Sequence, residues 1–414
     1  MAGASVAHPL IAPLPRVAAP AAPLLRRIAL ARLRATWAAG TLDLDLPGGE
    51  RVRLGEPRGP AEARARIHDD RVFVRLLLRG ELGAGEAFVA GEWTSDDVVA
   101  VARVFLRATR ASGVESPLTR LARLPALARH RRARNTRGGS ARNIHAHYDL
   151  GNDFYRLFLD PETFAYSCAI YPADRPETSL ADAQRAKHER VCELLELSPR
   201  DHLLEIGCGW GGLAIHAAQT RGCRVTAITV SREQYELAAA RAAAAGLADR
   251  VHVEYRDYRD LAGTFDKLAS IEMLEAVGFE HLPAYFAACA RTRATRLAIQ
   301  TITMPDDRFD AYRRGVDWMQ TYIFPGSCIP SLAAIRAAAA PAGLAIARTD
   351  DIGPSYAPTL RAWRERFVAA LPEVRRLGFD EPFVRTWLLY LAFSEAAFAE
   401  RTLGDHQLLL TSSR

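Results

Sequence analysis

The chain has 414 residues, of which 49% are hydrophobic and 25% charged. That length suggests two or three domains of about 100–200 residues each, and the apolar fraction excludes wholesale disorder. The net charge of +6 permits an anionic partner without requiring one.

No apolar run approaches the ~20 residues that would span a bilayer. Residues 1–23 are rich in alanine and proline and hold no basic residue before Arg16, so we expect no signal peptide. The six cysteines lie far apart without a CxxC pair, which argues against a disulfide framework and a zinc site. We therefore expect a cytoplasmic protein with free thiols and no metal.

Residues 24–38 place apolar side chains at helical spacing, with arginines between them. Two interpretations are open for this N-terminal extension (residues 1–39). The helix either packs on its own domain or lies on a membrane surface as a basic amphipathic segment.

The next segment, residues 40–108, mixes strand and helix patterns. Alternation over Thr41–Leu46 and Arg51–Leu54 predicts short strands, while Val72–Leu78 and Asp97–Leu106 predict helices. We expect a small α+β domain here and assign it the docking of lipid.

Residues 109–142 are predicted to be a basic linker. Arginines are frequent in it, and Glu115 is its one acid. A solvated linker is one interpretation, but the charge would also attract anionic lipid headgroups by about 1 kcal/mol per residue near the surface. No aromatic interleaving or nucleic-acid motif accompanies the arginines. We therefore expect a membrane partner and no nucleic acid.

Strands and helices alternate from about residue 181, within a predicted catalytic domain over residues 143–414. Such alternation predicts a parallel sheet with helices on both faces and ligands at the carboxyl ends of the strands. The expected strands are His202–Ile206, Cys223–Val230, Val251–Tyr255, Phe265–Ile271 and Arg296–Thr303. The expected helices include Ala181–Leu195, Leu213–Gln219 and Arg232–Ala244.

A glycine cluster, residues 207–212, directly follows the first of these strands. Glycines admit a close backbone approach to a ligand, and the carboxylate of Glu205 at the strand end can anchor an ammonium group. NAD enzymes place a ribose-binding acid about 20 residues later, but residues 228–231 contain none. The pattern favours S-adenosylmethionine, whose amino-acid part carries an ammonium.

Several motifs follow one another along the chain: HYDLGNDFY (147–155), YSCA (166–169), LEIGCGWGGLA (204–214), TVSREQYELA (229–238), SIEMLEAVG (270–278) and YIFPG (322–326). In this order they resemble the cyclopropane-fatty-acyl-phospholipid synthase family of S-adenosylmethionine-dependent methyltransferases. The resemblance runs from about residue 40 to 408 and is dense from 143 onward. It implies an α/β class I methyltransferase fold, which is Rossmann-like with a mostly parallel seven-stranded sheet.

The resemblance also implies a set of cofactor-binding residues. Tyr166 and Ser167 would hold the carboxylate end of the methionine part. Thr229 and Gln234 would bind the ribose, although helix capping is an alternative role for them. The remaining positions surround the amino-acid part or lie at the adenine edge: Glu205, Gly207, Gly209 and Arg259.

The family binds a bicarbonate ion as the base that removes a proton after methyl transfer. The matching positions here are Cys168 and Ile302 through their backbone amides, and Glu275, Gln300 and Tyr322 through their side chains. A buried thiol and a core tyrosine are the alternative roles for Cys168 and Tyr322.

Two departures from the family bear on the product. Gln300 stands where a histidine is usual, so it can donate an N–H group but cannot become cationic. Glu395 lies where many synthases carry a small residue; its carboxylate could order a donor, repel bicarbonate or replace it as base. Methyl transfer is therefore better supported than ring closure.

Aromatic residues complete the expected site. Tyr148 is a candidate active-site aromatic near the acceptor, or a motif tyrosine that only packs. Four others either line an acyl tunnel or belong to the core: Trp318, Phe324, Trp363 and Trp387.

These patterns predict a peripheral membrane enzyme that methylates the cis double bond of an unsaturated acyl chain in a phospholipid and forms a cyclopropane. The alternatives are a fatty acyl C-methyltransferase that gives methylene or methyl-branched chains, a small-molecule methyltransferase, and a non-catalytic lipid-binding protein. The oligomeric state is open, with a homodimer among the alternatives.

Overall fold

The computed structural model describes residues 22–56, 58–112, 124–132, 135–139, 150–172, 174–175 and 177–412. Tyr148 and much of the predicted basic linker lie outside these residues. The chain divides into two compact units. The first consists of Met1–Arg131, Gly315–Ile323 and Phe367–Thr402, and the second of Arg132–Arg314, Phe324–Arg366 and Leu403–Arg414.

The first unit contains a four-stranded sheet with strand order β2-β1-β3-β4. Its strands are β1 (Leu42–Asp45), β2 (Arg51–Leu54), β3 (Ala63–Ile67) and β4 (Trp93–Thr94). The two strands predicted near residues 41–54 are confirmed as an antiparallel hairpin. The sequence pattern does not reveal β3, because its inward-facing side chains are mostly alanines between exposed arginines.

Helices surround this sheet, and some of them come from far along the sequence. The C-terminal helix α18 packs against α3 and α4, and Glu400 just after it pairs with Arg103 at 2.6 Å. The helices of this unit are α1 (Ala22–Thr36), α2 (Arg71–Arg79), α3 (Glu81–Val89), α4 (Val98–Ser112), α6 (Leu124–Arg132), α14 (Trp318–Tyr322), α17 (Leu371–Arg376) and α18 (Glu381–Ala399).

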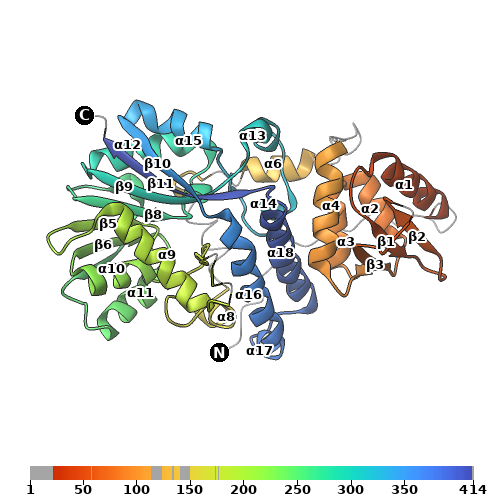
Figure 1. The fold of residues 1–414 in the computed structure, drawn as a ribbon, viewed down its shortest axis with the longest axis horizontal. Coiled ribbons are helices and arrows are strands. Elements are labelled where there is room, and N and C mark those ends of the chain that lie inside the picture. The colour runs from red at the N-terminus through yellow and green to blue at the C-terminus, as the bar shows by residue number, and fades with distance from the viewer. Residues whose placement is uncertain are drawn as a thin grey trace. The chain divides into compact units, whose positions relative to one another are not determined.

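The second unit is built on a seven-stranded sheet of order β10-β11-β9-β8-β5-β6-β7 (Figure 1). Five neighbouring strands are parallel, and β11 runs antiparallel to both β9 and β10. This arrangement confirms the predicted class I methyltransferase fold. The strands are β5 (His202–Ile206), β6 (Arg224–Thr229), β7 (Val251–Tyr255), β8 (Lys267–Ile271), β9 (Arg296–Thr303), β10 (Leu344–Asp351) and β11 (Gly404–Ser412).

Helices cover both faces of this sheet. Figure 1 shows α9 (Leu180–Leu195), α10 (Gly212–Arg221) and α11 (Arg232–Ala244) on one side, with α12 (Leu282–Arg291) and α15 (Leu332–Ala339) on the other. Alternate residues of β9 enter the two resulting cores, as the two-residue period of a strand requires. Shorter or connecting helices are α8 (Asn152–Arg156), α13 (Asp306–Tyr312) and α16 (Tyr356–Ala369).

None of the described helices combines the length and the apolarity that crossing a bilayer requires. The six cysteines are unpaired thiols, and all but Cys328 are buried. Among the described residues, no grouping of histidine, cysteine and acidic side chains suits a metal ion.

Candidate active site

A cavity of about 160 Å³ opens in the second unit at the carboxyl ends of the parallel strands. Its walls come from the residues that follow β5, β6, β7 and β8, together with residues 164–167 and two residues of α9. All eight predicted cofactor-binding residues line it: Tyr166, Ser167, Glu205, Gly207, Gly209, Thr229, Gln234 and Arg259.

The glycine loop adopts a backbone that other residues would strain. Gly207 and Gly209 have φ angles of +78° and +52°, a region that favours glycine. A Cβ atom on Gly207 would lie 2.8 Å from Cγ of Met273, whereas one on Gly209 would meet no atom within 4 Å. The loop therefore presents bare backbone to the cavity at Gly209.

A buried carboxyl group and a buried amino group line the cavity where an amino acid would be held. Glu205 is buried, its Oε2 atom has no hydrogen-bond partner, and burial raises its pKa to about 8. Lys187 is also buried, and its Nζ atom donates to Oγ of Ser167 at 2.7 Å. Burial lowers the pKa of Lys187. An unpartnered carboxylate oxygen and a buried cation are complementary to the ammonium and carboxylate of a free amino acid.

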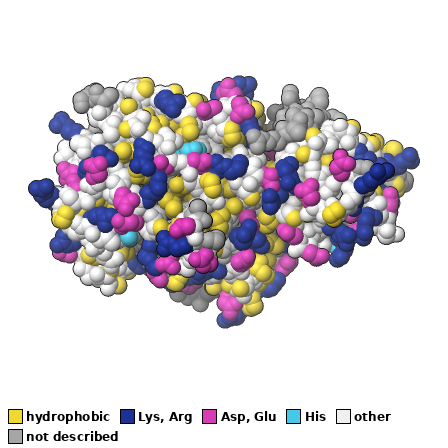
Figure 2. Space-filling view, in the orientation of Figure 1, with side chains coloured by type: hydrophobic (Ala, Val, Ile, Leu, Met, Phe, Trp, Pro, Cys, Tyr) yellow, Lys and Arg dark blue, Asp and Glu magenta, His cyan; other side chains and the backbone are white. Residues whose placement is uncertain are grey.

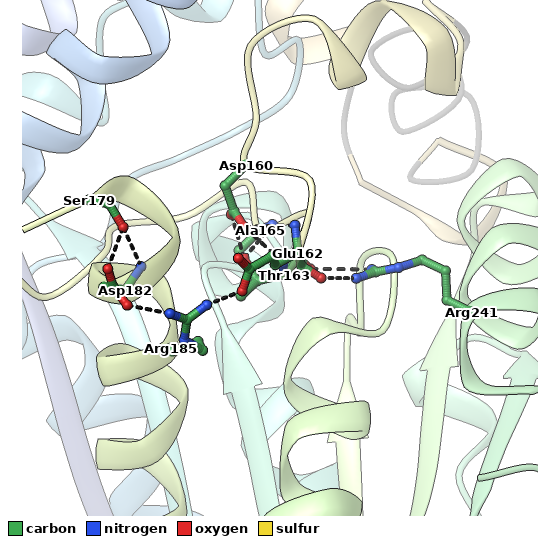
Figure 3. Close-up of polar contacts among 8 residues, drawn as sticks. All are labelled: Asp160, Glu162, Thr163, Ala165, Ser179, Asp182, Arg185 and Arg241. Atoms are coloured by element: carbon green, nitrogen blue, oxygen red, sulfur yellow. Dashed lines mark hydrogen bonds and ion pairs between the residues drawn. The ribbon is translucent and has the colours of Figure 1, made fainter. Parts of the chain in front are cut away.

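The loop before Tyr166 is held rigidly by its own polar contacts (Figure 3). The carboxylate of Asp160 accepts hydrogen bonds from the backbone N–H groups of Glu162 and Thr163 and from the Thr163 hydroxyl. From α11, Arg241 donates to the carbonyls of Glu162 and Thr163 at 2.6 and 3.2 Å. These bonds place Tyr166 and Ser167 at the cavity wall.

The outer side of the same loop is tied to α9 by exposed charges. Arg185 pairs with Glu162 and with Asp182, whose backbone N–H group is capped by Ser179 (Figure 3). On the inner side the loop touches α10 closely, since a Cβ atom on Gly212 would lie 2.5 Å from the Thr163 carbonyl oxygen. Only glycine admits this approach at position 212.

The side chains after β6 are linked to each other. The hydroxyl of Thr229 donates to Oε1 of Gln234 at 2.8 Å, and both residues are buried at the cavity wall. The N-cap of α11 is Ser231, not Thr229, so the alternative role of Thr229 as helix cap is not the one observed. Arg259 is fixed by Asp257 at 2.8 Å and by the carbonyl of Asn135 at 2.6 Å.

A carboxylate that the sequence analysis passed over, Glu272, joins two of the predicted catalytic residues. It follows β8 directly and lines the cavity. Its Oε1 atom accepts hydrogen bonds from the backbone N–H group of Cys168 at 2.8 Å and from Nε2 of Gln300 at 2.9 Å. Its Oε2 atom accepts from the hydroxyl of Tyr356 at 2.5 Å.

The amide of Gln300 is oriented by the neighbouring strand. Gln407 lies opposite Gln300 in the β9–β11 pair and donates its Nε2 group to Oε1 of Gln300 at 3.0 Å. Because that oxygen accepts from Gln407, the NH₂ group of Gln300 faces Glu272 and the carbonyl of Cys168. The Cys168 thiol is buried, and burial raises its pKa well above the usual value.

The predicted catalytic residue Glu275 contacts another predicted residue, Ile302. Its Oε1 atom accepts from the backbone N–H group of Ile302 at 2.5 Å and from the hydroxyl of Thr301 at 2.8 Å. Its Oε2 atom is buried without a partner. Burial and the nearby charge of Glu272 raise the pKa of Glu275 to about 8.

Two other predicted catalytic residues belong to the first unit. The hydroxyl of Tyr322 donates to Oε1 of Glu86 at 2.5 Å, and burial raises the pKa of Tyr322. Glu86 also pairs with Arg79 at 3.0 Å. Glu395 is buried within α18.

The tryptophans proposed for an acyl tunnel are all buried: Trp318, Trp363 and Trp387. In the second unit, the ring of Trp363 lies 5.2 Å from that of Tyr166 at the cavity wall. Their burial agrees with a core role, and their part in a tunnel stays a prediction.

Known proteins resemble this chain over most of its length. A model of the family described as mycolic acid cyclopropane synthetase matches residues 135–408. This match covers more than half of the chain. The chain belongs to this family.

Relatives and solved structures agree with that family. The tuberculostearic acid methyltransferase UfaA1 of Mycobacterium tuberculosis is 40% identical over 97% of this chain and 94% of the relative. The cyclopropane-fatty-acyl-phospholipid synthase of Escherichia coli is 34% identical over 85% and 89%. The mycolic acid cyclopropane synthase CmaA1, solved with SAH and CTAB, matches 66% of this chain and 98% of its own, with a TM-score of 0.60 and 28% identity.

Membership of this family makes the chain an S-adenosylmethionine-dependent methyltransferase. The residues present fit that cofactor, because the cavity offers a buried carboxylate oxygen without a partner at Glu205 and a buried cation at Lys187. The glycine loop leaves room for the ligand at Gly209.

Two residues of the cavity wall, Lys187 and Glu272, were not predicted from the sequence. Lys187 is one of only two lysines in the chain, a signal that alone does not indicate a ligand contact. Glu272 is an acid directly after a parallel strand, and the rule that ligands bind at the carboxyl edge of such sheets would have singled it out.

Proposed function

We propose that this enzyme transfers the methyl group of S-adenosylmethionine to the cis double bond of an unsaturated acyl chain in a membrane phospholipid and forms a cyclopropane. The observation that carries the proposal is that one cavity holds both Glu205 with Lys187 and the carboxylate of Glu272. Glu205 and Lys187 suit the cofactor. Glu272 offers the base that an acceptor needs once it has become a carbocation. The synthase from E. coli, which is similar over most of this chain, bears this activity in its name.

The cofactor supplies an electrophilic methyl group when bound. The chain itself has to hold a weakly nucleophilic double bond in line with that methyl, and such positioning contributes several kcal/mol to catalysis. It also has to exclude water from the cation that results. Tyr166 and Trp210 line the cavity, and aromatic faces stabilise a cation by about 0.5–2 kcal/mol each.

Access to a lipid substrate is proposed to begin at α1. Leu24 and Ile28 lie one helical turn apart and are 59% and 47% exposed. Arg27 and Arg34 are exposed on the same helix, which contains no acidic residue. An apolar stripe beside basic residues suits the surface of a membrane with anionic lipids. We propose that the enzyme works on the cytoplasmic face of the inner membrane.

The surface charges outside α1 do not favour the binding of a nucleic acid. On the face shown in Figure 2, basic and acidic side chains are interspersed over the described surface. Several arginines around the predicted basic linker are engaged within their own units. Arg107 pairs with Glu62, Arg129 donates to the carbonyl of Thr321, and Arg137 pairs with Asp260.

A methyl-branched or methylene product is the second candidate. Two observations favour it: Gln300 cannot become cationic as a histidine can, and the relative of 40% identity is named a tuberculostearic acid methyltransferase. The same methyl transfer gives this second product if the carbocation loses a proton without closing a ring.

The test is product analysis with purified protein, S-adenosylmethionine and liposomes of monounsaturated phospholipid. We expect fatty acid methyl esters that have gained one CH₂ group and take up no hydrogen on mild hydrogenation, as a cyclopropane would. The same gain followed by uptake of two hydrogens would establish the branched product. No gain on any acyl lipid would refute acyl-chain methylation.

A further inference from the structure

The backbone of Glu272 is held in an unusual conformation at the edge of the cavity. Its φ angle is +48°, a region that costs a residue with a Cβ atom of order 1–3 kcal/mol. Its backbone N–H group donates to the carbonyl of Gln300 at 2.7 Å. Such strain persists where the surroundings determine the side-chain position, and here it directs a carboxylate toward the cofactor cavity.

Three donors fix that carboxylate. They are the backbone N–H group of Cys168, Nε2 of Gln300 and the hydroxyl of Tyr356. A carboxylate has about four lone-pair sites, and the side chain of Asp405 is a further hydrogen-bonding neighbour of Glu272.

A bound bicarbonate does not fit this arrangement. Of the donors that the family resemblance assigns to the anion, three lie in the second unit, namely the backbone N–H groups of Cys168 and Ile302 and the side chain of Gln300, and Tyr322 lies in the first. Glu272 already accepts from two of them, and Glu275 accepts from Ile302. An added anion would have to displace the side chains of Glu272 and Glu275 from these donors.

Other acids around Glu272 are held in the protonated form. Burial and the nearby carboxylate of Glu272 raise the pKa of Asp405 well above its usual value, and the pKa of Glu275 is raised to about 8 by the same two causes. The buried Lys187 also interacts electrostatically with Glu272.

We propose that the carboxylate of Glu272 is the catalytic base of this enzyme and stands in place of bicarbonate. This inference rests on the proposed function. The π electrons of the double bond form the bond to the methyl group as the bond from that methyl to sulfur breaks, which leaves a carbocation on the neighbouring carbon. Glu272 takes a proton from the new methyl group, and the C–H electron pair closes the ring. The proton then passes from the carboxyl group to solvent.

Two variants test this assignment. Glu272→Gln keeps the shape of the side chain and removes the base. Glu272→Gly removes the carboxylate and suits a φ angle of +48°, because glycine adopts that region without strain. The matched control is Glu365→Gln, which removes an exposed carboxylate from the same unit. S-adenosylhomocysteine should bind to all of them by calorimetry with affinities within about threefold, which shows that the cofactor cavity is intact.

The first readout needs no lipid substrate. With S-adenosylhomocysteine present, we expect NMR of ¹³C-labelled bicarbonate to show no binding to the wild type and binding to Glu272→Gly, because the amide donors are released. Bicarbonate binding to the wild type at these donors would overturn the proposal, even if no acyl lipid were a substrate.

The second readout is turnover in buffer freed of carbon dioxide. We expect wild-type activity to be unchanged by added bicarbonate. The turnover of Glu272→Gln should fall by about 10²–10⁴-fold, which is the usual contribution of a general base. Added bicarbonate or formate should restore part of the activity of Glu272→Gly. Full activity of Glu272→Gln, or bicarbonate dependence of the wild type, would contradict the assignment. A wild type without product would refute the proposed function instead.

Discussion

At the scale of single residues, the cavity is distinguished by charges that are buried without full compensation. Glu205 has an unpartnered oxygen, and burial raises its pKa to about 8. Such a group costs free energy in the empty protein. The cost is recovered when a ligand ammonium approaches, because an opposite charge within about 4–6 Å stabilises the ionised form.

Cofactor binding should therefore release protons. Glu205 is protonated at pH 7 when its pKa is about 8, and a ligand ammonium lowers that pKa. We expect up to about one proton released per S-adenosylhomocysteine bound at pH 7, and an affinity that rises about tenfold per pH unit until pH 8. Calorimetry in buffers of different ionisation enthalpy measures the release. Glu205→Gln should bind more weakly and without this pH dependence; equal pH dependence in the variant would contradict the role of Glu205.

At the scale of elements, the regular strands follow from local patterns. The predicted spans of β2, β5, β7, β9 and α11 coincide with those observed. The strands β10 and β11 were not predicted, although β11 contributes Asp405 and Gln407 to the cluster around Gln300. Segments outside the regular helices and strands also contribute to the site. The loop before Tyr166 is held by Arg241, which lies on the distant helix α11.

We expect Arg241→Met to loosen this loop and to weaken S-adenosylhomocysteine binding by about tenfold, because the carbonyls of Glu162 and Thr163 lose a charged donor at about 1–3 kcal/mol. Arg185→Met is the matched control. It removes the same charge from exposed ion pairs on the outer side of the loop and should change the affinity by less than about twofold. Calorimetry measures both, and equal effects of the two variants would refute the positioning role of Arg241.

At the scale of the whole molecule, the two units are not successive stretches of the chain. The first combines residues from the N-terminus with Gly315–Ile323 and Phe367–Thr402. Truncation at residue 142 would remove α4 from its contact with α18 and expose apolar surface. Point variants of α1 are therefore a cleaner test of membrane docking than deletion.

We expect Leu24→Ser combined with Ile28→Ser to reduce binding to anionic liposomes by about 10–100-fold, since each apolar side chain contributes about 1.5–3 kcal/mol when fully buried. Cosedimentation with liposomes measures this, with S-adenosylhomocysteine affinity as the check on folding. Val368→Ser combined with Leu377→Ser is the matched control, because these side chains are 44% and 45% exposed on another part of the same unit. If both pairs reduced binding equally, the docking role of α1 would be wrong.

The sequence by itself determined the class of the fold, the glycine loop and the eight residues that line the cofactor cavity. The signal for the glycine loop is local, because a strand, a tight turn of glycines and a helix follow one another. The eight positions come from the motifs through which the chain resembles its family. The cofactor roles of the eight residues stay predictions.

Only the tertiary structure decided which groups meet around Glu272. Cys168, Glu272, Gln300 and Asp405 are far apart in the sequence, and the pairing of β8, β9 and β11 brings the last three together. Neither the strain at Glu272 nor the direction of the Gln300 amide can be deduced from residue types, since both depend on hydrogen bonds across the sheet. Local patterns predict the strands, but the register between strands determines which side chains contact one another.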